Sequence, residues 1–273
     1  MSRDLDLLVR EVQRLTSEIE QLRGRVEAYE RSRWMRMHPG LLLRRMRARR
    51  RDASLDAVGA AAPPSERPDD PLVARFRKEV LERGAFTHDW FTHQIVPWEP
   101  LLQELERRPS RLLEIGSFEG LSACYMLWRL PDAQVTCVDT FEGSVEYAVI
   151  DVDVSALQDV FAANIALVDA TRVRTFAGDS RRVLVDLIAG GERFDLVYID
   201  GSHLGLDVLV DTALSWQLLE DGGFLVFDDY HWKGVGEDPL LRPGPAVDAF
   251  LAFVDGKYEL LRKDVQVAVR KTG

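Results

Sequence analysis

The chain has 273 residues, of which 46% are hydrophobic, and a net charge of −10, which allows one full-sized domain with an appendage. No stretch approaches the roughly 20 uninterrupted apolar residues of a membrane span. The first residues also lack the basic-then-apolar pattern of a signal peptide. Two cysteines in apolar runs, Cys124 and Cys137, argue against a disulfide framework or a thiolate metal site. We therefore expect a soluble, cytoplasmic protein.

The charge is distributed unevenly along the chain. Residues 1–51 contain 14 arginines, no lysine and 7 acidic residues, so this segment is basic and the remainder is strongly acidic. An acidic body repels the phosphate backbone, which argues against a nucleic-acid partner.

A heptad pattern runs through the first 30 residues. Its apolar positions are Leu5, Leu8, Val12, Leu15, Ile19, Leu22, Val26 and Tyr29. This spacing predicts a coiled-coil oligomerisation helix over residues 1–33, and the β-branched and leucine positions favour a parallel homodimer. A trimer, or one amphipathic helix packed on its own domain, is the alternative.

Residues 34–70 form a second predicted segment. Its arginine-rich part ends at Arg51 and leads into a linker rich in Ala, Pro and Asp. The basic stretch over 31–51 is expected either to contact an anionic surface, such as lipid headgroups at the periphery of a membrane, or to be a solvated stalk.

From residue 71 the pattern becomes that of a globular α/β domain. Residues 71–108 are predicted to be a helical lid or substrate region, with helices over 72–83 and 98–107. Between and within them lie the aromatic and histidine residues His88, Trp90, Phe91, His93 and Trp98, which either stack on a substrate or anchor these helices.

Strands and helices alternate over residues 109–273. The predicted strands cover 111–115, 134–138, 173–177, 194–199, 223–227, 257–262 and 265–270, and the predicted helices cover 121–130, 155–167, 181–189, 208–219 and 246–254. Such alternation with apolar strands indicates a parallel sheet covered by helices on both faces. The short link between the last two strands predicts an antiparallel hairpin.

Three strand ends carry candidate cofactor residues. The first strand runs through Glu114 into the loop Gly116–Ser117–Phe118–Glu119–Gly120 and then a helix, and such a turn lets a ligand approach the backbone. Asp139, followed by Thr140, ends the second strand, where a carboxylate can accept ribose hydroxyl protons, a feature that enzymes with a nicotinamide cofactor share. Asp179 and Ser180 follow the third strand, and their alternative role is to cap a helix.

The fourth and fifth strands end in acidic residues. Asp200 follows strand 194–199, and Asp228 and Asp229 follow strand 223–227. Three carboxylates this close repel one another unless a cation neutralises them, and oxygen ligands suit Mg²⁺. Such an ion would hold a substrate hydroxyl and lower its pKa. The alternative is that these aspartates are loop caps and turn residues.

With these motifs, residues 110–232 resemble class I S-adenosylmethionine-dependent O-methyltransferases. The resemblance is to the metal-dependent group that includes macrolide-sugar and cephalosporin-type tailoring enzymes. The spacing of Asp200, Asp228 and Asp229 also matches the metal ligands of catechol O-methyltransferases. Catechol-type enzymes place a lysine base three residues after the first aspartate, where this chain has His203. A histidine can accept a proton near neutral pH, and His231 is a competing candidate base.

The resemblance implies a Rossmann-like, seven-stranded, mostly parallel sheet that binds S-adenosylmethionine and a divalent cation, expected to be Mg²⁺. The implied cofactor residues are Glu114, Gly116, Ser117, Gly120, Asp139, Thr140, Asp179, Ser180 and Asp200. The implied metal ligands are Asp200, Asp228 and Asp229, and the implied catalytic residues are His203 and Asp200.

The acceptor is less well defined by the sequence. A basic stalk on a tailoring-type enzyme favours a sugar hydroxyl in a polysaccharide, glycolipid or glycosylated natural product. A phenol or catechol is the second hypothesis, and a non-catalytic coiled-coil scaffold is the third. The acidic body and the absence of an Asn-Pro-Pro-Tyr-type motif argue against RNA.

Overall fold

The computed structural model describes residues 70–143, 154–232 and 239–273. The predicted coiled coil over 1–33 and almost all of the predicted segment 34–70 lie outside these residues and stay predictions. Within the described part of the chain, no helix is long and apolar enough to cross a membrane.

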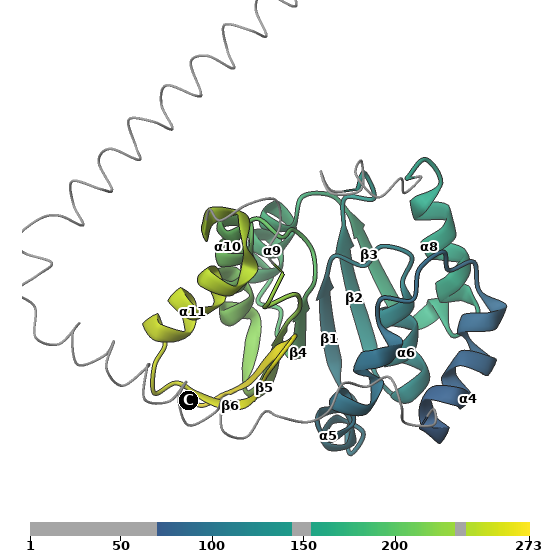
Figure 1. The fold of residues 1–273 in the computed structure, drawn as a ribbon, viewed down its shortest axis with the longest axis horizontal. Coiled ribbons are helices and arrows are strands. Elements are labelled where there is room, and N and C mark those ends of the chain that lie inside the picture. The colour runs from purple at the N-terminus through teal and green to yellow at the C-terminus, as the bar shows by residue number, and fades with distance from the viewer. Residues whose placement is uncertain (1–69, 144–153, 233–238) are drawn as a thin grey trace, which may run out of the picture. The chain divides into compact units, whose positions relative to one another are not determined.

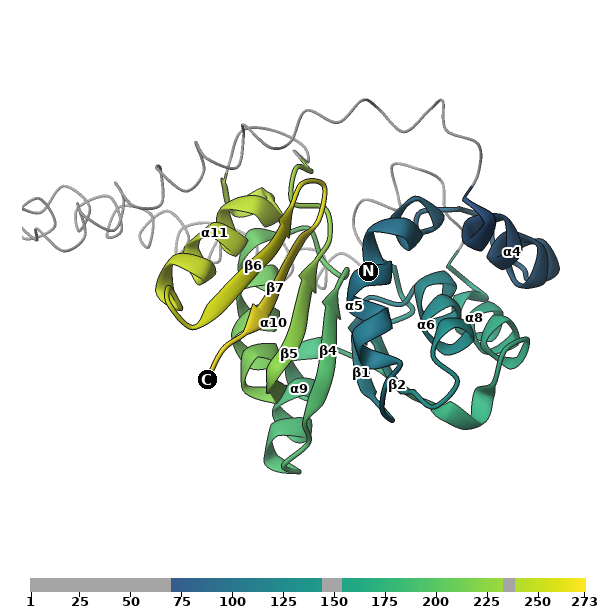
Figure 2. The same cartoon turned by 90° about the horizontal axis from the view of Figure 1, so that it is seen from below.

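Seven strands form one sheet in the order β3-β2-β1-β4-β5-β7-β6. Their bounds are β1 Arg111–Ile115, β2 Gln134–Asp139, β3 Val173–Ala177, β4 Phe194–Ile199, β5 Leu219–Phe227, β6 Tyr258–Lys263 and β7 Val267–Lys271. The first five strands pair in parallel, whereas β7 pairs antiparallel with both β5 and β6. The predicted mostly parallel sheet and its closing hairpin, visible beside β5 in Figure 2, are therefore confirmed.

Helices cover both faces of the sheet (Figure 1). Before β1 lie α4 Pro71–Glu79, a 3₁₀ helix over Leu81–Arg83 and α5 Ile95–Leu105. These pack on the same face as α6 Leu121–Arg129 and α8 Leu157–Ala166, whereas the other face carries α9 Ser180–Ala189, α10 Gly205–Leu218 and α11 Pro243–Phe253.

Alternation along the strands divides the core into two layers. In β1, Leu112 belongs to the apolar layer under α5 and α6, and Leu113 belongs to the layer under α9 to α11. Tyr198 in β4 belongs to the first layer. The same alternation places Glu114 on the face of β1 that carries Leu112, because side chains two residues apart in a strand point the same way.

The helix and strand boundaries depart modestly from the predictions. α5 begins three residues earlier than expected and carries Pro100 inside it, while β5 extends back to Leu219. α4 is shorter than predicted because the helix changes to a 3₁₀ turn after Val80. Asp70 caps α4 by accepting a hydrogen bond from the Leu72 N–H at 2.8 Å.

Candidate active site

The tips of β4 and β5 lie side by side and carry the acidic residues. Ile199 pairs with Phe227 at the ends of these strands. The ladder continues one step further, since the Asp228 N–H donates to the Ile199 carbonyl at 3.0 Å and the Asp200 N–H to the Ile115 carbonyl at 2.8 Å. Parallel pairing thus brings the two acidic tips together, as the sequence predicted.

Asp200, His203 and Asp229 form a compact group of potential metal ligands. One donor atom from each lies within 4.8 Å of the others. His203 Nε2 lies 2.7 Å from Asp229 Oδ2. The His203 ring packs on Trp232 with centroids 4.5 Å apart. Two carboxylates and one imidazole suit a divalent cation that takes oxygen and nitrogen ligands.

Asp200 Oδ2 accepts from the Tyr198 hydroxyl at 2.9 Å, and Asp228 is hydrogen-bonded more extensively. Its Oδ2 accepts hydrogen bonds from the Tyr198 hydroxyl and, at 3.0 Å, from Gln266 Nε2. Its Oδ1 accepts from the Asp229 N–H at 2.7 Å. The group of close donor atoms contains His203 and not Asp228, although a carboxylate with these partners keeps capacity for a further contact. Ligation by Asp228 stays a prediction.

Burial and mutual repulsion shape the electrostatics of this site. Burial raises the pKa of Asp200 well above its ordinary value, and the charges of Asp228 and Asp229 raise it further. The pKa of Asp228 is also raised, first by burial and then by Asp229. A bound cation would oppose both effects, because a nearby positive charge favours the ionised carboxylate.

The two candidate bases differ in position. His203 contacts the carboxylate group, as described above. His231 is exposed and packs edge-on against the Tyr230 ring at 4.9 Å. The geometry therefore favours His203 as the histidine of the site.

The glycines of the first loop are required by protein packing. Gly116 has φ +86°, and a Cβ there would overlap the Asp200 carbonyl and lie 2.5 Å from the Gly201 Cα. Gly120 has φ +83°, and a Cβ there would lie 2.9 Å from the Phe161 ring. The groups that approach the backbone of this loop closely are thus the end of β4 and α8 of the same protein. Contact with a cofactor stays a prediction.

Asp139 holds this loop in shape. Its Oδ2 accepts from the Ser117 N–H at 2.7 Å and the Phe118 N–H at 2.8 Å, and its Oδ1 accepts from the Phe141 N–H at 2.7 Å. The Thr140 hydroxyl accepts from the Glu142 N–H at 3.3 Å. A carboxylate has capacity for further hydrogen bonds, so ribose binding by Asp139 stays a prediction.

Glu114 lies beneath the loop and is fully buried. The Ser122 hydroxyl of α6 donates to its Oε1. Burial raises the pKa of Glu114 to about 7, although hydrogen bonds from Ser117, Ser122 and Cys137 oppose the shift. In this arrangement Glu114 supports the loop from behind, and its predicted contact with the cofactor is untested.

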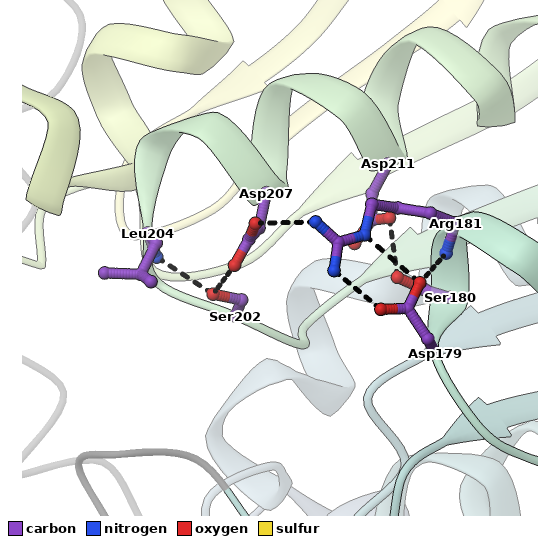
Figure 3. A network of polar contacts seen from close by, with 7 residues as sticks. All are labelled: Asp179, Ser180, Arg181, Ser202, Leu204, Asp207 and Asp211. Carbon is purple, nitrogen blue, oxygen red and sulfur yellow. Dashed lines mark hydrogen bonds and ion pairs between the residues drawn. The ribbon is translucent and has the colours of Figure 1, made fainter. Parts of the chain in front are cut away.

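Asp179 and Ser180 join a polar network between α9 and α10, which Figure 3 shows. Asp179 caps α9 by accepting from the Arg181 N–H at 3.0 Å, so the alternative role suggested for it is present, and it pairs with the Arg181 guanidinium at 2.6 Å. The Ser180 hydroxyl donates to Asp211 at 2.7 Å. Binding of the cofactor by this corner stays a prediction.

The same network reaches the loop that carries His203. The Ser202 hydroxyl donates to Asp207 at 2.9 Å and accepts from the Leu204 N–H at 3.1 Å (Figure 3). These two bonds tie the residues on either side of His203 to the first turn of α10.

The aromatic residues before β1 divide into two groups. Phe91 and Trp98 are buried in the core. Trp90 is 43% exposed and stacks on Phe118 of the glycine loop, with centroids 4.9 Å apart, and His88 packs against Trp90. The buried pair anchors the helices, whereas the exposed Trp90 and the half-buried His88 lie beside the glycine loop. His93 is exposed and contacts the Gln94 amide at 2.8 Å.

Sequence reasoning missed three residues of the site. Tyr198 could have been found from strand alternation, because it lies two residues before Asp200 and faces the same way. Gln266 and Trp232 gave no usable signal, since a lone glutamine or tryptophan has no motif around it.

Comparisons with known proteins identify similar sequences and folds. Residues 113–230 match the model of a family described as a methyltransferase domain. An uncharacterised protein of Acanthamoeba polyphaga mimivirus is 24% identical over 198 residues, which cover 71% of this chain and 83% of that protein.

Several solved methyltransferases share the fold. MycE, from the mycinamycin biosynthetic pathway and crystallised with Mg and SAH, has a TM-score of 0.52 and 19% identity over 74% of this chain and 55% of its own. A putative O-methyltransferase from Klebsiella pneumoniae has a TM-score of 0.53 and 20% identity over 77% of this chain and 93% of its own.

TomG of Streptomyces achromogenes, an O-methyltransferase of tomaymycin synthesis in complex with SAM, has a TM-score of 0.50 and 19% identity over 77% of this chain and 93% of its own. The present chain spans about half the length of MycE. Residues 113–230 thus match a methyltransferase-domain model, and the chain shares its fold with these solved methyltransferases, as the motifs predicted.

Proposed function

We propose that this protein is an S-adenosylmethionine-dependent, divalent-cation-assisted O-methyltransferase that acts on a hydroxyl group. The observation that carries the proposal is the group of Asp200, His203 and Asp229 at the carboxyl ends of β4 and β5. Ligands of open α/β sheets bind at this edge, which also holds the loop from Gly116 to Gly120.

Binding of S-adenosylmethionine is supported by the domain match and by related structures. MycE was crystallised with SAH and TomG with SAM. In this chain the glycine loop, Asp139 and the Asp179 corner all follow strands that end at one edge of the sheet. We propose that this edge holds the cofactor.

Asp200 and Asp229 are proposed to hold the cation, with His203 close to both. The donor set fits, because carboxylate oxygens are the preferred ligands of Mg²⁺, and MycE was crystallised with Mg. When bound, a divalent cation supplies a Lewis acid that lowers the pKa of the acceptor hydroxyl.

His203 is proposed to remove the proton of that hydroxyl. Asp229 lies 2.7 Å from its Nε2 and would stabilise the imidazolium once the proton has moved. The acceptor oxygen then forms a bond to the methyl carbon as the carbon–sulfur bond breaks, which leaves S-adenosylhomocysteine. Much of the acceleration would come from holding the two substrates in line.

A sugar hydroxyl is the proposed acceptor, in a polysaccharide, glycolipid or glycosylated natural product. The choice of this substrate class is supported by MycE, which was also crystallised with mycinamycin VI. The exposed Trp90 beside the glycine loop would stack on a sugar ring or on a phenol ring, so it fits both acceptor classes. Homodimerisation through residues 1–30 and anionic contact through 31–51 complete the proposal and await their own tests.

Two other functions lead to different observations. A phenol or catechol acceptor would be favoured if a chain without the first 70 residues remained fully active on small phenols. A non-catalytic scaffold would be favoured if the folded protein bound no cofactor.

The first test is calorimetric titration of the full chain with S-adenosylmethionine, with and without Mg²⁺. We expect micromolar binding, followed by methyl transfer to members of a glycan and phenol panel. Folded protein that binds no S-adenosylmethionine in either condition would overturn the proposal.

A further inference from the structure

Gln266 links the carboxylates of the site to residues outside the matched domain. It lies just before β7, beyond residues 113–230, and is fully buried. Its Oε1 accepts from the Trp98 indole N–H at 2.8 Å, and its Nε2 donates to Asp228 Oδ2 at 3.0 Å. Trp98 belongs to α5, which precedes the matched domain, and is also buried.

Trp98 fixes which way the Gln266 amide faces. The indole N–H can only donate, so it requires the carbonyl oxygen of the amide. The amide NH₂ must then face Asp228, where it can only donate to the carboxylate. The orientation of Gln266 therefore follows from its partners. The Asp264 side chain holds its backbone, accepting from the Gln266 N–H at 3.0 Å.

The Asp228 carboxylate, held by Gln266, in turn positions the backbone of Asp229. With Oδ2 held by Gln266 and Tyr198, Asp228 Oδ1 accepts the Asp229 N–H at 2.7 Å. Asp229 has φ +51°, a left-handed conformation that is unfavourable for most residues and needs local support. This turn directs the Asp229 carboxylate to His203.

We propose that Gln266 is a positioning residue of the site: oriented by Trp98, it holds Asp228 so that the strained turn presents Asp229 to His203 and to the cation. The inference rests on the proposed function. Its consequence is that elements outside the matched residues 113–230, namely α5 and the β6–β7 hairpin, complete the metal site.

The test compares Mn²⁺ affinity, measured by titration with electron paramagnetic resonance detection, in full-length variants. We expect Gln266→Leu to weaken Mn²⁺ binding by about tenfold to a hundredfold, the usual effect of removing a group that orients a metal ligand. Affinity for S-adenosylmethionine without metal should stay within about twofold, because Gln266 touches no residue assigned to the cofactor. Gln217→Leu, at an exposed position of α10, is the matched control and should bind Mn²⁺ like the wild type.

A double variant separates positioning from stability. Gln266→Leu leaves the Trp98 N–H buried without its acceptor, which lowers stability, and adding Trp98→Phe removes that N–H. Relative to Gln266→Leu, we expect the double variant to gain the stability lost through the unpaired N–H, offset in part by the cavity that the smaller ring leaves, but not to regain Mn²⁺ affinity. The inference would be overturned if the double variant recovered Mn²⁺ affinity together with stability. It would also be overturned if a folded Gln266→Leu protein bound Mn²⁺ within twofold of the wild type. Either result would leave the proposed function standing. A wild-type protein that binds no Mn²⁺ would overturn the metal-assisted function and the inference with it.

Discussion

Replacing Gly116 with alanine should damage the fold and the site together. The residue has φ +86°, and its new Cβ would meet backbone atoms of Asp200 and Gly201, which cannot rotate away as a side chain can. The left-handed conformation costs an alanine about 1–2 kcal/mol, and forcing a methyl group into packed surroundings costs about 1–3 kcal/mol more. We expect Gly116→Ala to lose about 2–5 kcal/mol of stability in total.

Two other glycines provide graded controls. Gly191 has φ +70° and no atom within 4 Å of the place that an added methyl group would take, so Gly191→Ala should lose only the conformational part, about 1–2 kcal/mol. Gly120 has φ +83° and faces the Phe161 ring, which can shift, so Gly120→Ala should fall between the two. The benefit of restricting the unfolded chain is common to all three variants and cancels in the comparison.

Urea denaturation of the full chain, followed by tryptophan fluorescence, measures these differences. In a thermal melt each lost kcal/mol should lower Tm by roughly 2–4 °C for a domain of this size. Equal losses for Gly116→Ala and Gly191→Ala would refute the reasoning, because they would show that the tips of β1 and β4 separate without cost.

Three further predictions concern the site and the buried Glu114. Asp200→Asn should abolish Mg²⁺-dependent methyl transfer while leaving the fold intact. Asp132→Asn, an exposed control at the opposite edge of the sheet, should leave turnover unchanged. Substantial activity in Asp200→Asn would show that Asp200 does not bind the metal. His203→Ala should flatten the pH–rate profile between about 6 and 8, and an unchanged profile would show that His203 is not the base. Burial raises the pKa of Glu114 from 4.5 to about 7, so between these two pH values the folded state binds more protons than the unfolded state. The stability that the protonated Glu114 side chain contributes is therefore present at pH 4 and is lost as the pH rises through 7. Glu114→Gln should remove this pH-dependent loss of stability, which is worth roughly 3 kcal/mol at pH 8. Urea denaturation of both proteins at pH 4 and pH 8 measures the difference. A pH dependence that is the same in the variant and the wild type would contradict the raised pKa of Glu114.

The sequence alone determined the fold class and the edge of the sheet at which the site lies. Apolar strands alternating with helices require a parallel sheet covered on both faces, and parallel strands all end at the same edge. Asp139 ends a strand, and Asp200 and Asp228 each follow one, so their convergence followed from the topology without any knowledge of packing. The bounds of α5 and β5 did not follow, because Pro100 and the polar start of β5 are tolerated only through tertiary contacts.

Only the tertiary structure decided what each of these side chains bonds to. Asp139 is engaged by loop N–H groups, Asp179 caps α9, and Asp228 faces Tyr198 and Gln266 while His203 joins Asp200 and Asp229. Trp98 and Gln266 meet across 168 residues of sequence. No local pattern encodes that contact, because the partner of a buried polar group is set by which elements the whole sheet brings together and by the cost of leaving the group unpaired.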